Sequence, residues 1–173
     1  MEKWIRELPI SRVAYPSSVA DRLKFWFWKV YSPFHPFVRD ASFHIGIGKF
    51  LMHRVVPETK ASGRQDFLLG VLNPAHSVQE LVSFLIKQGF GNHFVAWKDV
   101  DEVVSLRRTV DFKHQYHLRI FADGEVRCHF EYTPEYHPFL HLVRVGFEDR
   151  TSEFKELLQE WVIAPSTSSK ANS

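Results

Sequence analysis

Histidines and arginines alternate along residues 114–133, where their types could serve acid–base or anion-binding chemistry. His117 and His129 could act as general base and general acid, because imidazole titrates near neutral pH. Arg119 and Arg127 could clamp a phosphate or a carboxylate through paired N–H donors. Either chemistry requires these four side chains to lie on one face of the same structural element.

Asp123-Gly124 lies in the middle of this stretch and predicts a β-hairpin. A two-residue turn would mix polar and apolar side chains on both faces. A three-residue loop over 122–124, with Gly124 in the left-handed conformation, separates them, so this bulged register is favoured. Its cross-strand pairs are Ile120–Val126, Arg119–Arg127, Leu118–Cys128, His117–His129, Tyr116–Phe130, Gln115–Glu131 and His114–Tyr132.

The favoured register gathers a polar face that suggests a binding site. Its members are Gln115, His117, Arg119, Arg127, His129 and Glu131. Because two arginines lie side by side, the leading hypothesis is a non-enzymatic module that binds a small anionic ligand bearing a phosphate or a carboxylate. The alternative is a metal-independent phosphoesterase or nuclease in which His117 and His129 are catalytic. Whether the protein is an enzyme stays undecided.

A metal centre is the least favoured hypothesis for this face. His117, His129 and Glu131 could be ligands, but the neighbouring arginine pair would oppose a divalent cation. His137 and His141 have a helical ligand spacing, which Pro138 interrupts. No metal and no cofactor are therefore expected.

Two simpler roles for the polar face are also open. It could be the solvated side of an antiparallel sheet, where charged side chains are normal. It could instead be neutralised by the last helix, whose acidic residues are Glu153, Glu156 and Glu160. Both roles would leave this face without a ligand.

A second candidate surface lies on the predicted helix 18–31, which interleaves aromatic and basic residues. Trp26, Phe27 and Trp28 could dock on a protein partner or on a membrane surface. The same helix could instead be a core helix buried on two sides. The net charge of +2 and the absence of a basic run make nucleic acid an unexpected partner.

Composition indicates an ordinary globular protein. The chain has 173 residues, of which 45% are hydrophobic, and is expected to form one compact domain over 1–163 with a disordered tail over 164–173. The sequence contains one cysteine. Neither a signal peptide nor a transmembrane segment is expected, because the first residues lack an apolar core and no apolar run has the length of a membrane span. A cytoplasmic location is the expectation.

The remaining patterns predict the elements that surround the hairpin. Helices are expected after Ser17 or Ser18, from the Ser77 cap to Gly89, and from Thr151 or Ser152 onward. Strands are expected over 43–56, 66–72, 93–97 and 140–147, whereas 99–106 as a helix and 103–112 as a strand stay alternatives. This order predicts an α+β fold with a largely antiparallel sheet packed by helices, including a C-terminal helix.

Overall fold

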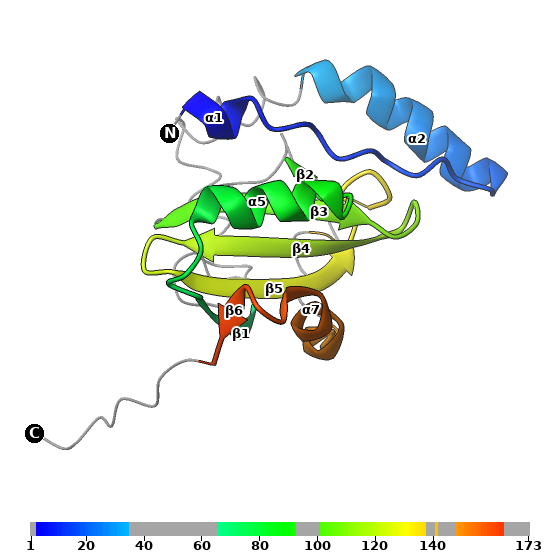
Figure 1. The fold of residues 1–173 in the computed structure, drawn as a ribbon. Coiled ribbons are helices and arrows are strands. Elements are labelled where there is room, and N and C mark those ends of the chain that lie inside the picture. Colours follow the sequence, from blue (N-terminus) through cyan, green and yellow to red (C-terminus); the bar gives the residue numbers. More distant parts are fainter. Residues whose placement is uncertain (1–2, 35–65, 93–100, 138–140, 142–147, 165–173) are drawn as a thin grey trace, which may run out of the picture.

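The computed structural model describes residues 3–34, 66–92, 101–137, 141 and 148–164. Within them, six antiparallel strands form one sheet in the order β2-β3-β4-β5-β1-β6 (Figure 1). The strands are β1 (Phe67–Leu72), β2 (Gly91–Asn92), β3 (Glu102–Thr109), β4 (His114–Phe121), β5 (Glu125–Tyr132) and β6 (Val162–Ile163). The predicted strands over 43–56 and 93–97, and most of the one over 140–147, lie outside the described residues.

Helices pack on one face of this sheet and beyond one end of it. The described helical elements are α1 (Lys3–Arg6), α2 (Val19–Tyr31), the 3₁₀ turn η1 (Ser32–Phe34), α5 (Val78–Lys87) and α7 (Thr151–Leu158). In Figure 1, α5 and α7 lie over the same side of the sheet, whereas α2 extends beyond one end of it. The predicted α+β class with an antiparallel sheet and a C-terminal helix is confirmed.

Short-range signals in the sequence explain where these helices begin and end. Ser77 and Glu80 form the predicted capping box at the start of α5, and Gly89 follows the helix with a φ of +85°. Ser18 caps α2 by accepting a hydrogen bond from the backbone N–H of Asp21. The last helix ends at Leu158, so it is shorter than its apolar pattern suggested.

The hairpin of β4 and β5 has the predicted bulged register. All seven predicted cross-strand pairs are present, and Gly124 has a φ of +84° in the connecting loop. The strand alternative for the preceding segment is the correct one, because β3 pairs with β4 along its length. The polar positions of three neighbouring strands therefore share one face.

The apolar face of the sheet forms the core under α5 and α7. Its fully buried members from the strands and helices include Leu81, Leu85, Val104, Leu106, Leu118, Ile120, Val126, Cys128, Phe154 and Leu158. The predicted burial of Cys128 is confirmed, with 0% of the residue exposed. Among the helices in the described part of the chain, none has the length and hydropathy to cross a membrane.

Candidate functional site

The polar face of the hairpin is buried, not solvated. Gln115, His117, Arg119, His129 and Glu131 are each at most 3% exposed. Burial of this many polar groups requires that they satisfy one another, because an unpaired polar group in the interior costs free energy. The expectation of a solvated sheet face is therefore wrong for these five residues.

The last helix does not neutralise this polar face. Phe154 and Leu158 of α7 belong to the core on the opposite side of the sheet. On that side, Glu153 accepts hydrogen bonds from Tyr116 and Arg150. The expectation that the acidic residues of this helix cover the histidines and arginines is wrong, because α7 uses its apolar stripe to cover the other face.

Two histidine rings and a carboxylate meet at the centre of the polar face. His117 Nδ1 lies 2.8 Å from His129 Nε2, and the two rings are nearly perpendicular. The Glu131 carboxylate lies 3.3 Å from His117 Nδ1 and 3.4 Å from His129 Nε2. These three residues form a group whose potential metal-ligand atoms all lie within 4.8 Å of one another.

The outer nitrogens of both rings have hydrogen-bonding partners. His129 Nδ1 lies 2.5 Å from Asp66 Oδ1, and His117 Nε2 lies 2.6 Å from Ser105 Oγ. The ionised carboxylate of Asp66 can only accept, so His129 Nδ1 donates to it, and His129 Nε2 faces His117 Nδ1. A continuous chain thus runs from Ser105 through both rings to Asp66.

Further polar groups orient the Glu131 carboxylate. Gln115 Nε2 donates to Glu131 Oε1 over 2.6 Å. His141 Nδ1 lies 3.3 Å from Glu131 Oε2 and donates to the backbone carbonyl of Tyr132 over 2.9 Å. The second carboxylate oxygen of Glu131, Oε2, is buried and accepts no hydrogen bond from the described residues.

The paired arginines form ion pairs with different carboxylates. Arg119 forms ion pairs with Asp66 and, over 3.0 Å, with Glu102. Arg127 pairs with Glu125 over 2.8 Å and is only half-buried. The cross-strand repulsion that their register implies is thereby relieved, and both guanidinium groups are ion-paired within the molecule.

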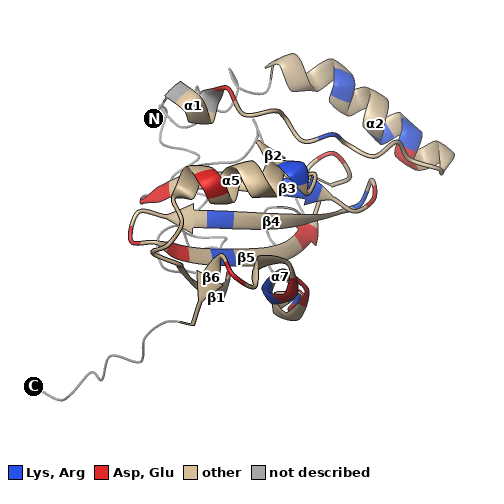
Figure 2. Cartoon of the chain, in the orientation of Figure 1, with Lys and Arg blue, Asp and Glu red and all other residues tan. Residues whose placement is uncertain are grey.

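A second buried arginine extends the network along β3. Arg107 binds Glu135 through two hydrogen bonds of 3.0 and 2.8 Å, and it donates to Gln115 over 3.0 Å. Its Nε donates to Ser11 Oγ over 2.5 Å. Gln115 therefore links this ion pair to Glu131, so the polar groups of β3, β4 and β5 form one connected layer; β3 and β5 each carry acidic and basic positions (Figure 2).

The electrostatics of this layer favour ionised carboxylates and a charged imidazole. Burial alone would raise the pKa of Glu131, but His141, His129 and His117 hold it well below its ordinary value. Burial likewise opposes charge on His129, yet Glu131 and Asp66 outweigh it and raise the pKa of that imidazole. Despite its burial, Asp66 has a lowered pKa through His129 and Arg119. The carboxylates thus prefer a cation between them.

The structure adds residues that the hairpin pattern did not contain. They are Asp66, Glu102, Ser105, Arg107, Glu135 and His141. The period-2 alternation of β3 could have predicted Ser105 and Arg107, had this segment been assigned to a strand. Nothing local identifies Asp66, which lies 63 residues from His129 in the sequence.

The other candidate residues separate into two groups. Trp28 is buried, whereas Trp26 and Phe27 of the same helix are 56% and 71% exposed. His141 contributes to the polar layer through Glu131. His137 is half-buried and makes a ring contact with Tyr136, and its carbonyl accepts a hydrogen bond of 2.9 Å from the backbone N–H of His141.

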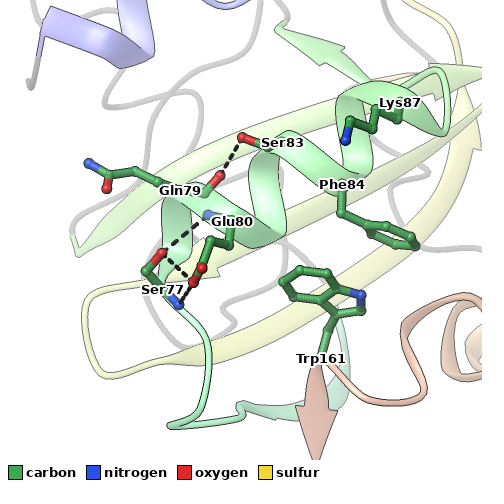
Figure 3. Close-up of a pocket in the computed structure, with 7 residues that line it drawn as sticks. All are labelled: Ser77, Gln79, Glu80, Ser83, Phe84, Lys87 and Trp161. Carbon is green, nitrogen blue, oxygen red and sulfur yellow. Dashed lines mark hydrogen bonds between the residues drawn. The ribbon is translucent and has the colours of Figure 1, made fainter.

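A surface hollow of about 520 Å³ lies between α5 and Trp161 (Figure 3). The rings of Phe84 and Trp161 stack at 5.1 Å and form its apolar wall. On the other side, Ser77 and Glu80 are hydrogen-bonded to each other in the α5 capping box. The hollow contains none of the predicted site residues, and two of its polar side chains, Ser77 and Glu80, cap the helix.

Comparison of the chain with protein-family models, with curated proteins and with solved structures finds no match.

Proposed function

We propose that the chain binds a divalent transition-metal ion at His117, His129 and Glu131. The observation that carries the proposal is the convergence of one ligand atom from each residue, all within 4.8 Å of one another, with His117 Nδ1 and His129 Nε2 only 2.8 Å apart. A metal ion about 2.0–2.2 Å from each ligand atom requires separations of about 3.0–3.4 Å between them at tetrahedral or octahedral angles. Movement of the side chains by about 1 Å would therefore bring the three ligand atoms around one ion.

The charge of the buried layer also supports a cation. Its carboxylates are Asp66, Glu102, Glu131 and Glu135, and its guanidinium groups are Arg107 and Arg119. Among the described groups, Asp66 and Glu131 stabilise a positive charge on His129, and a divalent ion at the same place would interact with the same two carboxylates.

The outer hydrogen bonds suit both rings for this role. Asp66 orients the His129 ring through Nδ1, so Nε2 is the nitrogen that would ligate. His117 can donate from Nε2 to Ser105 Oγ, which leaves Nδ1 as its ligand atom. Binding would replace the hydrogen bond between these two ligand nitrogens and release the proton that they share. Two imidazoles and one carboxylate favour an ion such as Zn²⁺ or Fe²⁺ over Mg²⁺ or Ca²⁺.

The sequence pattern disfavoured a metal because of the neighbouring arginine pair, and this reason no longer holds. It assumed that Arg119 and Arg127 keep a positive potential beside the histidines, but each guanidinium is ion-paired with carboxylate. For the same reason, anion binding by these arginines has less support, and it stays a prediction. Acid–base catalysis by His117 and His129 stays a prediction as well.

Metal analysis of the purified full-length chain tests the proposal. We expect about one equivalent of transition metal by elemental analysis, or, after chelation, a Zn²⁺-induced rise in the melting temperature. His129→Gln and Glu131→Gln should each weaken Zn²⁺ binding about a hundredfold or more, and Asp66→Asn about 10- to 100-fold. His114→Gln, on the same hairpin but outside the centre, should bind as the wild type does.

Circular dichroism must show that each variant is folded before its affinity is compared. A folded wild-type chain that neither retains metal nor responds to Zn²⁺ would contradict the proposal. A rise in melting temperature with inorganic phosphate in place of Zn²⁺ would instead support the anion-binding hypothesis.

A second candidate function, docking through α2, has separate support. Trp26 and Phe27 are more than half exposed although they are large apolar side chains. The buried Trp28 belongs to the opposite side of the helix and has no part in it. Docking through this helix predicts that Leu23→Ser with Phe27→Ser alters partner binding and leaves the melting temperature unchanged.

A further inference from the structure

The outward face of α2 is an apolar stripe. Its exposed side chains are Val19 (72%), Leu23 (68%), Trp26 (56%), Phe27 (71%) and Val30 (70%). At about 3.6 residues per turn, these positions fall within an arc of about 100°. A contiguous apolar surface of this kind on a water-exposed helix indicates an interaction site.

The inward face of α2 fixes this orientation. Phe25 is buried and packs edge-to-face against Phe112, with ring centroids 6.1 Å apart. Asp21 is buried and lies 3.8 Å from Lys113 Nζ. Trp28 is only 7% exposed. Because these contacts hold the opposite side of the helix, the apolar stripe faces away from the described body of the protein.

The charged residues of α2 are arranged unequally around the stripe. Arg22 and Lys29 lie along one border, next to Trp26 in the helical projection. The acidic residue of this helix, Asp21, is turned inward, and Lys24 Nζ lies over the Tyr136 ring at 4.1 Å. The exposed charges that border the stripe are therefore positive.

We propose that α2 docks on the surface of a membrane rich in anionic lipid, with the stripe in the boundary between headgroups and acyl chains. This inference rests on the docking role proposed for α2 and assigns it a partner. An apolar helix face with aromatic side chains and a basic border is the composition of interfacial helices. Trp26 at the border suits the headgroup level, and Arg22 and Lys29 would contact lipid phosphates.

The dimensions of α2 agree with binding parallel to the surface. Its 13 residues span about 20 Å, too little to cross a hydrocarbon core of about 30 Å. Lys29 is exposed and its Nζ lies 5.7 Å from the centre of the Trp26 ring, so a cation accompanies the aromatic side chain at the border of the stripe. The stripe can thus enter the lipid while the basic groups remain among the headgroups.

Vesicle binding by the full chain tests this inference. We expect co-sedimentation with vesicles of phosphatidylcholine and phosphatidylglycerol, a blue shift of tryptophan emission, and much weaker binding to pure phosphatidylcholine. Leu23→Ser with Phe27→Ser should weaken binding about tenfold or more. Arg22→Glu with Lys29→Glu should weaken it about tenfold and remove its sensitivity to salt. Ile163→Ser and Lys87→Glu are exposed controls outside α2 and should bind normally.

Three outcomes would overturn the inference. Equal binding to both kinds of vesicle would remove the anionic requirement. Absence of vesicle binding, together with a dimer that Leu23→Ser and Phe27→Ser dissociate, would make a second copy the partner and leave the docking role intact. If acrylamide quenching of the wild type and of Trp26→Phe shows that Trp26 is shielded in the free protein, both the lipid inference and the docking role fail.

Discussion

The two faces of the hairpin sheet are both buried, but different forces hold them. On one face, Leu118 and Val126 pack beneath α5 and α7. On the other, Arg119 and His129 are enclosed in a layer of hydrogen bonds and ion pairs. Apolar burial is favourable for each side chain separately, whereas a buried charge is tolerated only when its partners are in place. The apolar face can therefore be weakened gradually, and the polar face fails when one member is removed.

The largest effect should follow removal of Arg119. Arg119→Met keeps the side-chain length but leaves Asp66 and Glu102 without their shared guanidinium. We expect the free energy of unfolding to fall by about 3–5 kcal/mol, measured by urea denaturation. Addition of Glu102→Gln should recover part of this loss, and the contrast between the faces is wrong if the single variant is as stable as the wild type.

The neighbouring residue tests the apolar face. Leu118→Ala removes a fully buried side chain from the core and should cost about 2–5 kcal/mol. Because the cavity opens on the opposite side of the sheet, Zn²⁺ affinity of the folded protein should be unchanged. Isothermal titration calorimetry of the variant measures this, and a large loss of affinity would show that the faces are not independent.

The reactivity of the Cys128 thiol measures how well the apolar face is shielded from solvent. Burial is the main cause of its raised pKa, with Asp66 and Asp149 adding to the effect. The native thiol therefore stays protonated, and its contribution to stability is present below the ordinary thiol pKa of about 8.5 and declines as the pH rises above it. At pH 8, labelling with a disulfide reagent should proceed far more slowly in the native protein than in urea; equal rates would indicate an open core.

The smallest effect is expected at the rim of the apolar face. The Tyr116 hydroxyl donates to Glu153, whose side chain is 43% exposed and also pairs with Arg150. Water can replace this partner, so Tyr116→Phe should change the free energy of unfolding by less than about 1 kcal/mol. Thermal denaturation monitored by circular dichroism measures this change. A loss of stability comparable to that of Leu118→Ala would show that this contact at the rim contributes as much as a core residue does.

Short-range patterns accounted for much of the fold. The alternation around Gly124 predicted the hairpin register, and Ser77 with Glu80 predicted the start of α5. Residues 99–112 were ambiguous, because a short run of apolar and charged residues fits either a helix or a strand until its neighbour is known. Pairing with β4 decided it.

The site was predictable only in part. The sequence brought His117, His129 and Glu131 together, because residues two apart on paired strands share a face. It did not predict that Arg119 is ion-paired with Asp66 and Glu102, since these partners come from the residue before β1 and from β3. The sequence pattern alone therefore left this arginine unpaired beside the histidines.

The sequence by itself determined which side chains share each face of the hairpin, because strand periodicity and turn geometry act between residues close in the chain. Only the tertiary structure decided that the polar face is buried, that Arg119 is paired with carboxylates from other segments, and that the apolar stripe of α2 faces outward. Burial and charge compensation depend on which distant segments come into contact, and a local pattern of residue types does not determine those contacts.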